Sequence, residues 1–546
     1  MTLPDFDALH YPHSSRRTVV HAKNGMVASG NPTASSIGLQ TLLKGGNAVD
    51  AAVAMAASMP LVEPTGNGLG SDAFVMVWKD GRLFGLNGSG PSPAGASIES
   101  YRAKGLDHVP ARGVHSVDVP GAVGAWAAVH ERFGRLSFEE TLAPAIRYAE
   151  EGFPVSPTVA DNWERGFRLF SGLRESERAA GRDAAWLEPW FEHFAPEGRA
   201  PLPGEVFASP DIARTLRRIA ATKGEDFYRG ELAREIAGFF AAHGGFLSEE
   251  DLAAYRPEWV EPISVSYRGY DVWEMPPNGH GITVLMALQI LKGFEPGERL
   301  TAATMHRQIE AMKLAMSDTA EYVTEPSAMR VTVENLLNPA YAESRRALIG
   351  ERAMLPKAGD PRGSSTVYFC AADRDGMMVS FIQSNYRGFG SGVVIPGTGI
   401  SINDRAENFR FDAAHANRLE GGKRPYHTII PGFLTKDGEA VGPFGIMGGF
   451  MQPQAHVQVL ENLIDWHLNP QQALDAPRWQ WTGGRHVDVE YDMPQAEVLG
   501  LIRRGHEVSV VADLNLMGRG QMILRDPSGV YVGGTEKRTD GTIMGW

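Results

Sequence analysis

Hydrophobic positions along the 546-residue chain follow two spacings. Apolar residues at every second position, bounded by glycine and aspartate turns, predict strands, whereas apolar residues three and four positions apart predict helices. Helices are predicted at residues 33–43, 49–59 with an end at Pro60, 120–133, 138–152, 282–291, 300–323 and 454–468. Strands are predicted within residues 18–31 and at 73–78, 83–86, 265–273, 367–372, 377–383, 426–434 and 440–446, with a final antiparallel meander over 507–532. The pattern alone predicts a mixed α/β protein.

One predicted strand begins with a residue that can do chemistry. Thr366 stands directly before the apolar run 367–372, which a turn at residues 373–376 joins to the strand 377–383. By itself a threonine here is an ordinary β-former. If the Ser365–Thr366 bond were cut, Thr366 would carry a free α-amine beside its hydroxyl. With a pKa of about 7.7–8.0, that amine can accept the hydroxyl proton, so one residue supplies both nucleophile and base.

The residues before Thr366 differ in composition from the rest of the chain. From about 346 to 365 the sequence is rich in Lys, Gly, Asp, Pro, Arg and Ser, which is typical of an exposed linker. A cleavage site at the end of such a linker is consistent with this composition.

Composition and charge narrow the class of protein. Hydrophobic residues make up 43% of the chain, which is enough for a large core, and the net charge of −13 argues against a nucleic-acid partner. The one cysteine, Cys370, cannot form an internal disulfide, and its place in an apolar strand predicts a buried side chain. No His-Glu-x-x-His motif or cysteine pair is present, so we expect neither a metal nor another cofactor.

The first residues and the apolar runs of the chain indicate where in the cell to expect the protein. Residues 1–7 contain acids and a proline where a signal peptide has basic residues and an apolar run, and no run approaches eighteen apolar residues. We therefore expect a cytoplasmic protein with no membrane partner.

Several motifs together resemble the γ-glutamyltransferase family of N-terminal-nucleophile hydrolases. They are Gly45–Ala52, Glu63–Gly70, Thr366–Tyr368, the turn Asp373–Gly376, Phe389–Gly392, Gly397–Ile400, Lys423–Pro425 and Met447–Gly449. The resemblance implies a four-layer αββα sandwich built from both pieces of a self-cleaved precursor. The large piece would be residues 1–365 and the small piece residues 366–546, paired with each other after cleavage.

The resemblance also implies roles for individual residues. Thr366 would be the nucleophile, freed by cleavage of the Ser365–Thr366 bond, and its amine the general base. Ser384 falls where the family has a threonine whose hydroxyl supports the nucleophile. Gly448 and Gly449 match a glycine pair whose backbone N–H groups stabilise the oxyanion.

The predicted substrate pocket departs from the family pattern. Residues 87–93 contain no arginine where the family uses one to hold the substrate α-carboxylate. Asn408 replaces the acid that holds the α-amino group, His427 and Thr428 replace a serine pair, and Arg405 replaces an amide side chain. An arginine can grip a carboxylate, while an asparagine cannot neutralise an ammonium group. The four residues therefore predict a pocket suited to an acid without a free α-amine, or one that holds the glutamyl group differently.

Three functions remain open at this stage. The first is a self-processing amidohydrolase or acyltransferase acting on a γ-glutamyl amide such as glutathione. A short lid segment at residues 410–422 favours hydrolysis over transfer. The second is an amidase for another small carboxylate amide, of the oxamate amidohydrolase or cephalosporin acylase kind, and the third is an unprocessed, non-catalytic binding protein. The oligomeric state is left open, with a homo-oligomer of the paired pieces as one option.

Overall fold

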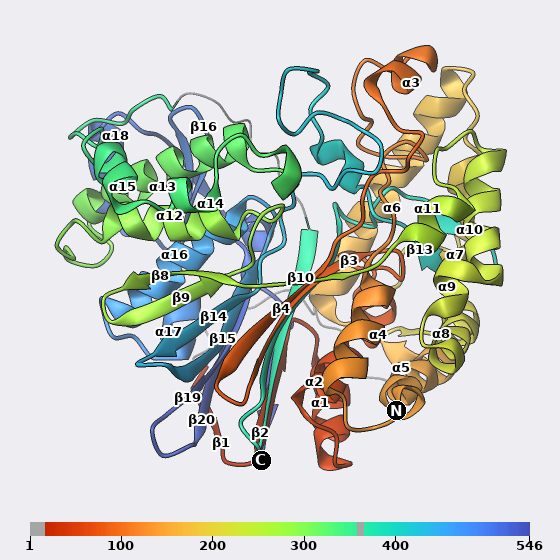
Figure 1. Ribbon diagram of the computed structural model, residues 1–546, viewed down its shortest axis with the longest axis horizontal. Helices are drawn as coiled ribbons and strands as arrows, with labels where there is room; N and C mark the ends of the chain where they lie inside the picture. The colour runs from red at the N-terminus through yellow and green to blue at the C-terminus, as the bar shows by residue number, and fades with distance from the viewer. Residues whose placement is uncertain (1–16, 357–364) are drawn as a thin grey trace.

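Two seven-stranded sheets lie face to face in the computed structural model, which describes residues 17–356 and 365–546 (Figure 1). Every pairing within these two sheets is antiparallel. The first, called the β15 sheet, has the order β1 (Val20–Ala22), β20 (Tyr531–Thr535), β19 (Arg519–Arg525), β15 (Glu439–Met447), β14 (Gly432–Lys436), β9 (Tyr270–Glu274) and β8 (Ile263–Tyr267). The second, called the β10 sheet, has the order β21 (Thr542–Gly545), β2 (Gly25–Ser29), β10 (Ser365–Asp373), β11 (Met378–Tyr386), β3 (Asp72–Lys79), β4 (Arg82–Gly88) and β7 (Glu258–Val260).

Strand periodicity explains how the β10 sheet can be buried on both faces. In β3, Phe74, Met76 and Trp78 pack between the two sheets, while Val75 and Val77 pack against the helices on the other face. Alternate side chains of a strand point to opposite faces, so a continuous apolar run fits a strand that is covered twice.

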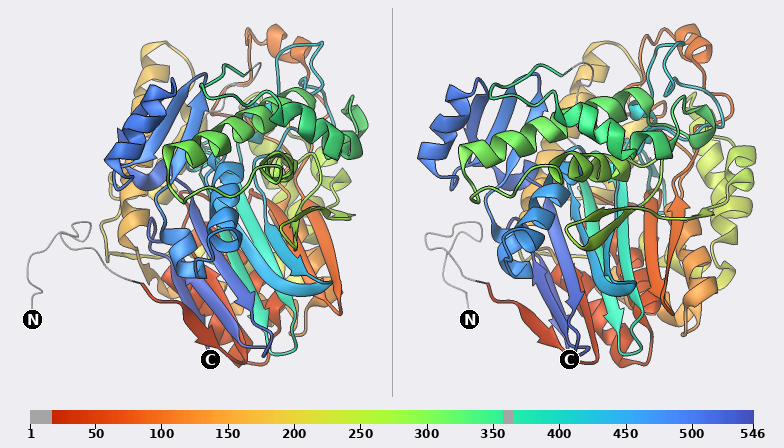
Figure 2. Two further views of the ribbon diagram at one scale, coloured as in Figure 1. Left: turned by 90° about the vertical axis from the view of Figure 1, so that its left-hand side faces the viewer. Right: turned by 60° about the vertical axis from the view of Figure 1, so that its left-hand side comes forward.

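Helices cover the outer face of each sheet. On the β10 sheet these are α1 (Pro32–Leu43), α2 (Ala48–Val62) and α4 (Ala122–Phe133). On the same side of the molecule are α5 (Phe138–Glu151), α6 (Pro157–Ala179), α7 (Glu188–Phe194), α8 (Pro210–Thr222), α9 (Glu225–Arg229), α10 (Glu231–Ala242) and α11 (Glu249–Ala254). On the β15 sheet they are α12 (Gly281–Leu291), α16 (Met451–Ile464) and α17 (Pro470–Asp475), with α13 (Ala302–Tyr322), α14 (Val333–Leu336), α15 (Pro339–Arg346) and α18 (Gln495–Arg503) further out. Figure 2 turns this second side toward the viewer. The predicted four-layer αββα architecture is confirmed.

The helix predicted to end at Pro60 continues to Val62. A proline cannot donate a hydrogen bond to the carbonyl four residues earlier, which here is that of Ala56. Gln383 Nε2 on β11 donates to this carbonyl at 3.4 Å instead. A partner more than 300 residues away therefore satisfies the group that the proline leaves free.

Three strand predictions were also wrong. The region 265–273 is a hairpin, β8 and β9, which turns at Arg268 and Gly269, both at positive φ. Residues 426–431 form no strand, because β14 begins at Gly432. The meander 507–532 is divided, because β18 (Glu507–Val511) pairs in parallel with β17 (His486–Glu490) in a separate sheet completed by β16 (Trp479–Gly483).

Three other findings complete the fold. Cys370 is buried between the two sheets, as predicted. The end of the predicted linker, residues 357–364, lies outside the described residues. No helix among the residues described is long and apolar enough to span a bilayer.

We expect Gly445→Ala to destabilise the sandwich. A Cβ on Gly445 of β15 would overlap the ring of Tyr368 on β10, where the two sheets pack together. Overpacking of this kind costs about 1–3 kcal/mol. Urea unfolding measures the loss.

Gly172→Ala is the matched control, because nothing lies within 4 Å of a Cβ at this position in α6. It should leave stability unchanged or raise it by up to about 1 kcal/mol. If Gly445→Ala unfolds at the same urea concentration as the wild type, the packing argument is wrong.

Candidate active site

Thr366 lies at an irregularity in the pairing of β10 with β11. Ser365 is opposite Tyr386 and Val367 is opposite Gln383, so the register shifts at the residue between them. The Thr366 side chain is fully buried. Such irregularities release one residue from the regular ladder and redirect its side chain.

Two polar side chains hold the Thr366 hydroxyl. Its Oγ1 lies 3.1 Å from Ser384 Oγ, and Gln452 Nε2 donates to it at 3.4 Å. The backbone N–H of Tyr386 donates to Ser384 Oγ at 2.8 Å, which fixes that hydroxyl in turn. The structure therefore brings together Thr366 and Ser384 as predicted, and adds Gln452.

Gly448 and Gly449 connect β15 to α16 directly beside this hydroxyl contact. Their φ angles of 134° and 57° lie in the region that favours glycine. Gln452, three residues after Gly449, is the residue that reaches Thr366. Gln452 belongs to the first turn of α16, which begins at Met451, so the positive end of this helix lies near Thr366, an arrangement that suits a developing oxyanion.

Arg405 is buried beside the site. Its NH1 donates to Thr428 Oγ1 at 2.8 Å, and its guanidinium lies 4.8 Å from the centre of the Tyr386 ring. Among the described residues, Nε and NH2 of Arg405 have no hydrogen-bond partner. This side chain therefore keeps donor capacity for a carboxylate or a water molecule.

His427 is paired with a residue that the sequence did not single out. Its Nε2 donates to Asp72 Oδ2 at 2.9 Å. Burial raises the pKa of Asp72 to about 7, against the opposing effect of Arg405, and burial lowers the pKa of His427 well below its ordinary value. Asp118, also buried, has no hydrogen-bond partner for either carboxylate oxygen in the described structure, and burial raises its pKa well above the ordinary value. An aspartate at the start of an apolar strand was the one available signal for Asp72.

Asn408 lies in the wall of a cavity of about 390 Å³. The cavity adjoins the site through Tyr386, which is paired with Ser365, and Phe450, which follows Gly449. Asn408 Nδ2 has no partner among the described residues. Six aromatic residues line the cavity, namely Tyr386, Phe409, Phe411, Tyr426, Phe450 and Trp481. Of the predicted substrate-binding residues, only Asn408 lines this cavity, whereas Arg405, His427 and Thr428 lie buried beside it.

Comparison with known sequences identifies the family. The family described as gamma-glutamyltranspeptidase matches residues 34–546. The chain belongs to this family. The glutathione hydrolase-like YwrD proenzyme of Bacillus subtilis is 36% identical, covering 97% of this chain and 99% of the relative. The oxamate amidohydrolase proenzyme of Klebsiella pneumoniae is 33% identical, covering 96% of this chain and all of the relative.

Solved structures agree with the sequence comparison. The crystal structure of a cephalosporin acylase from Bacillus halodurans is 56% identical, covers 100% of this chain and 99% of that chain, and superposes with a TM-score of 0.94. This member of the gamma-glutamyltranspeptidase family is therefore an enzyme, a hydrolase of the N-terminal-nucleophile class. Its substrate does not follow from these similarities, because the relatives differ in the substrates that they are named for.

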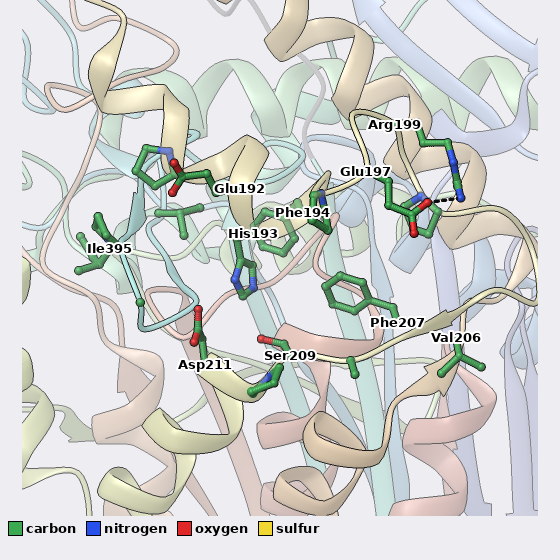
Figure 3. A pocket seen from close by; sticks show the side chains of 18 of the residues that line it. Glu192, His193, Phe194, Glu197, Arg199, Val206, Phe207, Ser209, Asp211 and Ile395 are labelled. Carbon is green, nitrogen blue, oxygen red and sulfur yellow. Dashed lines mark hydrogen bonds and ion pairs between the residues drawn. The ribbon is translucent and has the colours of Figure 1, made fainter.

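A second cavity, of about 340 Å³, lies elsewhere in this gamma-glutamyltranspeptidase family member (Figure 3). It is formed between residues 189–211 and residues 394–397, which include the short strand β12 (Val394–Ile395), and its lining shares no residue with the Thr366 site. Its one arginine, Arg199, is already bonded to Glu197 and Glu205. The cavity is therefore separate from the predicted chemistry.

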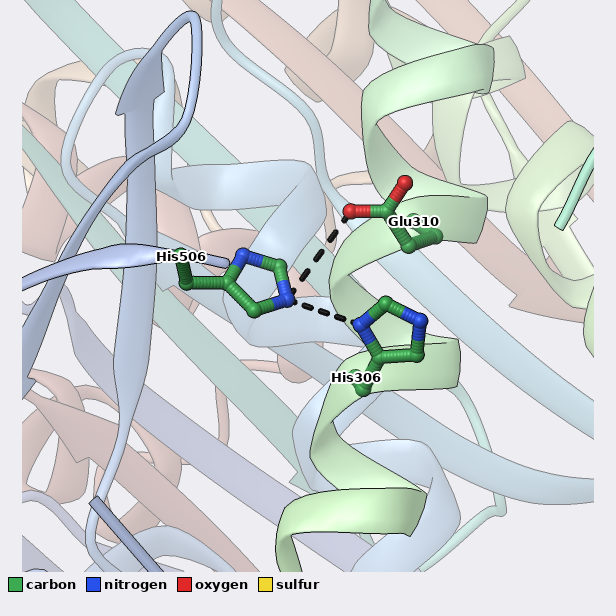
Figure 4. Close-up of side chains that lie close together, drawn as sticks. All are labelled: His306, Glu310 and His506. Atoms are coloured by element: carbon green, nitrogen blue, oxygen red, sulfur yellow. Dashed lines mark hydrogen bonds and ion pairs between the residues drawn. The ribbon is translucent and has the colours of Figure 1, made fainter. Parts of the chain in front are cut away.

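One group among the described residues has the composition of a metal site. His306, Glu310 and His506 place their ligand atoms within 4.8 Å of one another (Figure 4). However, Lys313 Nζ donates to Glu310 Oε1 at 2.7 Å, so an ammonium already neutralises the carboxylate that a cation would need. The group is therefore better described as a hydrogen-bonded cluster.

The pH dependence of stability should change in Asp72→Asn. A pKa of about 7 in the folded state, against 3.8 ordinarily, means that folded Asp72 keeps a proton that the unfolded chain releases. This contribution is present below about pH 4 and is lost as the pH rises through 7. Asparagine cannot ionise, so the thermal midpoint of Asp72→Asn should rise relative to that of the wild type as the pH increases from about 4 to 7.

Asp437→Asn, in the exposed turn between β14 and β15, serves as control and should follow the wild-type curve. A constant difference between Asp72→Asn and the wild type across this range would contradict the raised pKa.

Proposed function

We propose that the protein is a self-processing amidohydrolase with Thr366 as its nucleophile. The contact of Thr366 Oγ1 with Ser384 and Gln452, beside the Gly448–Gly449 turn, carries the proposal. In maturation, Thr366 Oγ1 attacks the carbonyl carbon of Ser365, the peptide bond becomes an ester, and water hydrolyses that ester. This frees the Thr366 amine and divides the chain into residues 1–365 and 366–546.

The same atoms then serve the amide substrate. The Thr366 amine takes the hydroxyl proton as Oγ1 attacks the substrate carbonyl carbon, and the backbone N–H groups of Gly448 and Gly449 stabilise the oxyanion. The C–N bond breaks, the proton passes to the leaving amine, and an acyl-threonine ester remains. Water hydrolyses the ester and restores Thr366. The open cavity beside the site gives water access, so we propose hydrolysis as the main outcome.

For the acyl group, we propose a carboxylate-bearing acid without a free α-amine. Glu407 is the only carboxylate among the lining residues of the 390 Å³ cavity, and it already forms an ion pair with Arg387. Asn408 is neutral, so a substrate ammonium would lose water without gaining a counter-charge. Arg405, buried beside the cavity with unused donors, suits a carboxylate. The similarity to a cephalosporin acylase and an oxamate amidohydrolase supports the same class.

Hydrolysis of γ-glutamyl amides is the second candidate. The names of several relatives favour it, including the glutathione hydrolase-like YwrD proenzyme. For either substrate we place the enzyme in the cytoplasm, as a pair of the two pieces and without a cofactor.

Intact mass spectrometry tests the nucleophile. The wild type should yield two pieces that meet at Ser365/Thr366, whereas Thr366→Ala should remain one chain because it has no hydroxyl. Thr366→Ser keeps a hydroxyl and should still divide. A wild-type chain that stays whole after prolonged incubation would instead support the non-catalytic binding protein.

A matched pair of anilides tests the acyl group, because glutaryl and γ-glutamyl p-nitroanilides differ only in the α-amino group. The wild type should have the higher kcat/KM for the glutaryl compound. Asn408→Asp supplies a charge for the ammonium and should shift the ratio of kcat/KM values toward the γ-glutamyl compound by about tenfold, the effect of about 1.4 kcal/mol.

Asn408→Ala is the control, since it removes the amide without adding charge and should produce no such shift. A wild type that prefers the γ-glutamyl anilide would overturn the acyl-group assignment and favour the second candidate.

A further inference from the structure

A buried polar cluster joins two distant parts of the chain. His306, Glu310 and Lys313 lie on successive turns of α13, and His506 follows α18 (Figure 4). His306 Nδ1 and His506 Nε2 are 2.8 Å apart, and Lys313 Nζ is 2.7 Å from Glu310 Oε1. All four residues are buried, although they take no part in the proposed chemistry.

The hydrogen-bond partners of the two histidines show which ring nitrogens carry a proton. His306 Nε2 lies 2.9 Å from the carbonyl oxygen of Gly350, which can only accept, so this nitrogen carries the proton. His306 Nδ1 therefore accepts, and His506 Nε2 donates to it. Burial lowers the pKa of His506 to about 3 and also lowers that of His306, so both rings are neutral near pH 7.

The cluster fixes the last described segment before the cleavage site. The backbone N–H of Met354 donates to Glu310 Oε2 at 3.0 Å, and Lys313 Nζ donates to the Met354 carbonyl at 3.2 Å. Together with the Gly350 carbonyl on His306, these bonds hold residues 350–354 against α13.

Residues beside His506 hold the same segment from the other side. The backbone N–H of Ala353 donates to the Arg504 carbonyl at 2.8 Å, and Arg352 NH1 donates to the Arg503 carbonyl at 2.7 Å. Arg504 NH1 donates to the Glu351 carbonyl at 3.2 Å. Residues 350–354 are thus bonded to the part of the chain before residue 366 and to the part after it.

We propose that His306, Glu310, Lys313 and His506 are positioning residues for self-cleavage. They fix Met354, which lies eleven residues before Ser365, and so fix the starting point of the chain that leads to the Ser365–Thr366 bond. The alignment of the Ser365 carbonyl carbon with Thr366 Oγ1 depends on the direction in which the preceding chain approaches, and these bonds fix where that approach begins. A small loss of alignment between a nucleophile and the carbonyl that it attacks slows such an intramolecular step several-fold.

The anchor also outlasts the cleavage, because none of its bonds includes Ser365 or Thr366. After maturation it would keep the new end of the large piece bound to the small piece through His506 and its neighbours. The proposal rests on the proposed function, since it concerns the rate at which that enzyme matures.

The test compares His506→Phe with the wild type. Phenylalanine keeps a ring but leaves His306 Nδ1 without a donor. Self-cleavage, followed by intact mass spectrometry of purified precursor, should slow about three- to tenfold because the reacting groups lose alignment. Amide hydrolysis by the matured variant should keep its kcat and KM within twofold. Trypsin should cut the matured variant at Arg352, and the wild type should be cut there more slowly.

His486→Phe is the matched control, because His486 is exposed on the neighbouring strand β17 and should leave all three readouts unchanged. If His506→Phe does not fold, the surface double variant Arg352→Ala/Arg504→Ala removes two bonds to the same segment and should slow cleavage in the same direction.

Two results would overturn the positioning role. One is cleavage by these variants at the wild-type rate. The other is a parallel loss of cleavage, amide hydrolysis and thermal midpoint, which would mean a role in stability alone. Failure of the proposed function looks different, since the wild-type chain itself would then remain whole.

Discussion

The register between β10 and β11 determines which side chains meet Thr366. Neighbouring residues of a strand point to opposite faces, so a one-residue slip would exchange Ser384 for Gln383 at the nucleophile. Gln383 also holds this register, because its side chain accepts from Trp126 Nε1 at 2.8 Å and donates to the Ala56 carbonyl on the helix side. The bond that completes α2 around Pro60 therefore helps to keep Ser384 on the other face, 3.1 Å from the Thr366 hydroxyl.

The charged groups near the site are divided between the protein interior and the wall of the cavity. Arg405, Asp72 and Asp118 lie together in the interior, where Arg405 lowers the pKa of both carboxyl groups against the effect of burial and Asp72 raises that of Asp118. The adjoining cavity is lined by aromatic rings and by an ion pair that Arg387 and Glu407 complete between themselves. Because an isolated charge is costly to bury, a cavity whose one carboxylate is already paired offers a substrate ammonium no counter-charge, while Arg405 and Asn408 keep unused donors.

Local sequence signals predicted the elements but not the contacts between distant segments. Apolar periodicity located most helices and the strand pair after Thr366, since burial on one or two faces leaves a local pattern. The end at Pro60 was wrong because Gln383 supplies a partner that no local pattern contains. Gln452 was missed for the same reason, and family resemblance pointed to the glycines before it instead. His306 and His506 are 200 residues apart, so only the folded chain shows that they meet.

The topology explains how the chain, if cut at the proposed Ser365–Thr366 bond, would remain a single body. The β15 sheet contains β1, β8 and β9 from before the proposed cleavage site, together with β14, β15, β19 and β20 from after it. In the β10 sheet, β10 and β11 lie between β2 and β3, and both of these outer neighbours precede the proposed cleavage site. Separating the pieces would break strand pairs in both sheets, whereas cutting Ser365–Thr366 breaks none of the pairings from Val367 onward. Cleavage can therefore create the amine that catalysis needs at little cost in stability, because covalent continuity at this bond is not what holds the sandwich together.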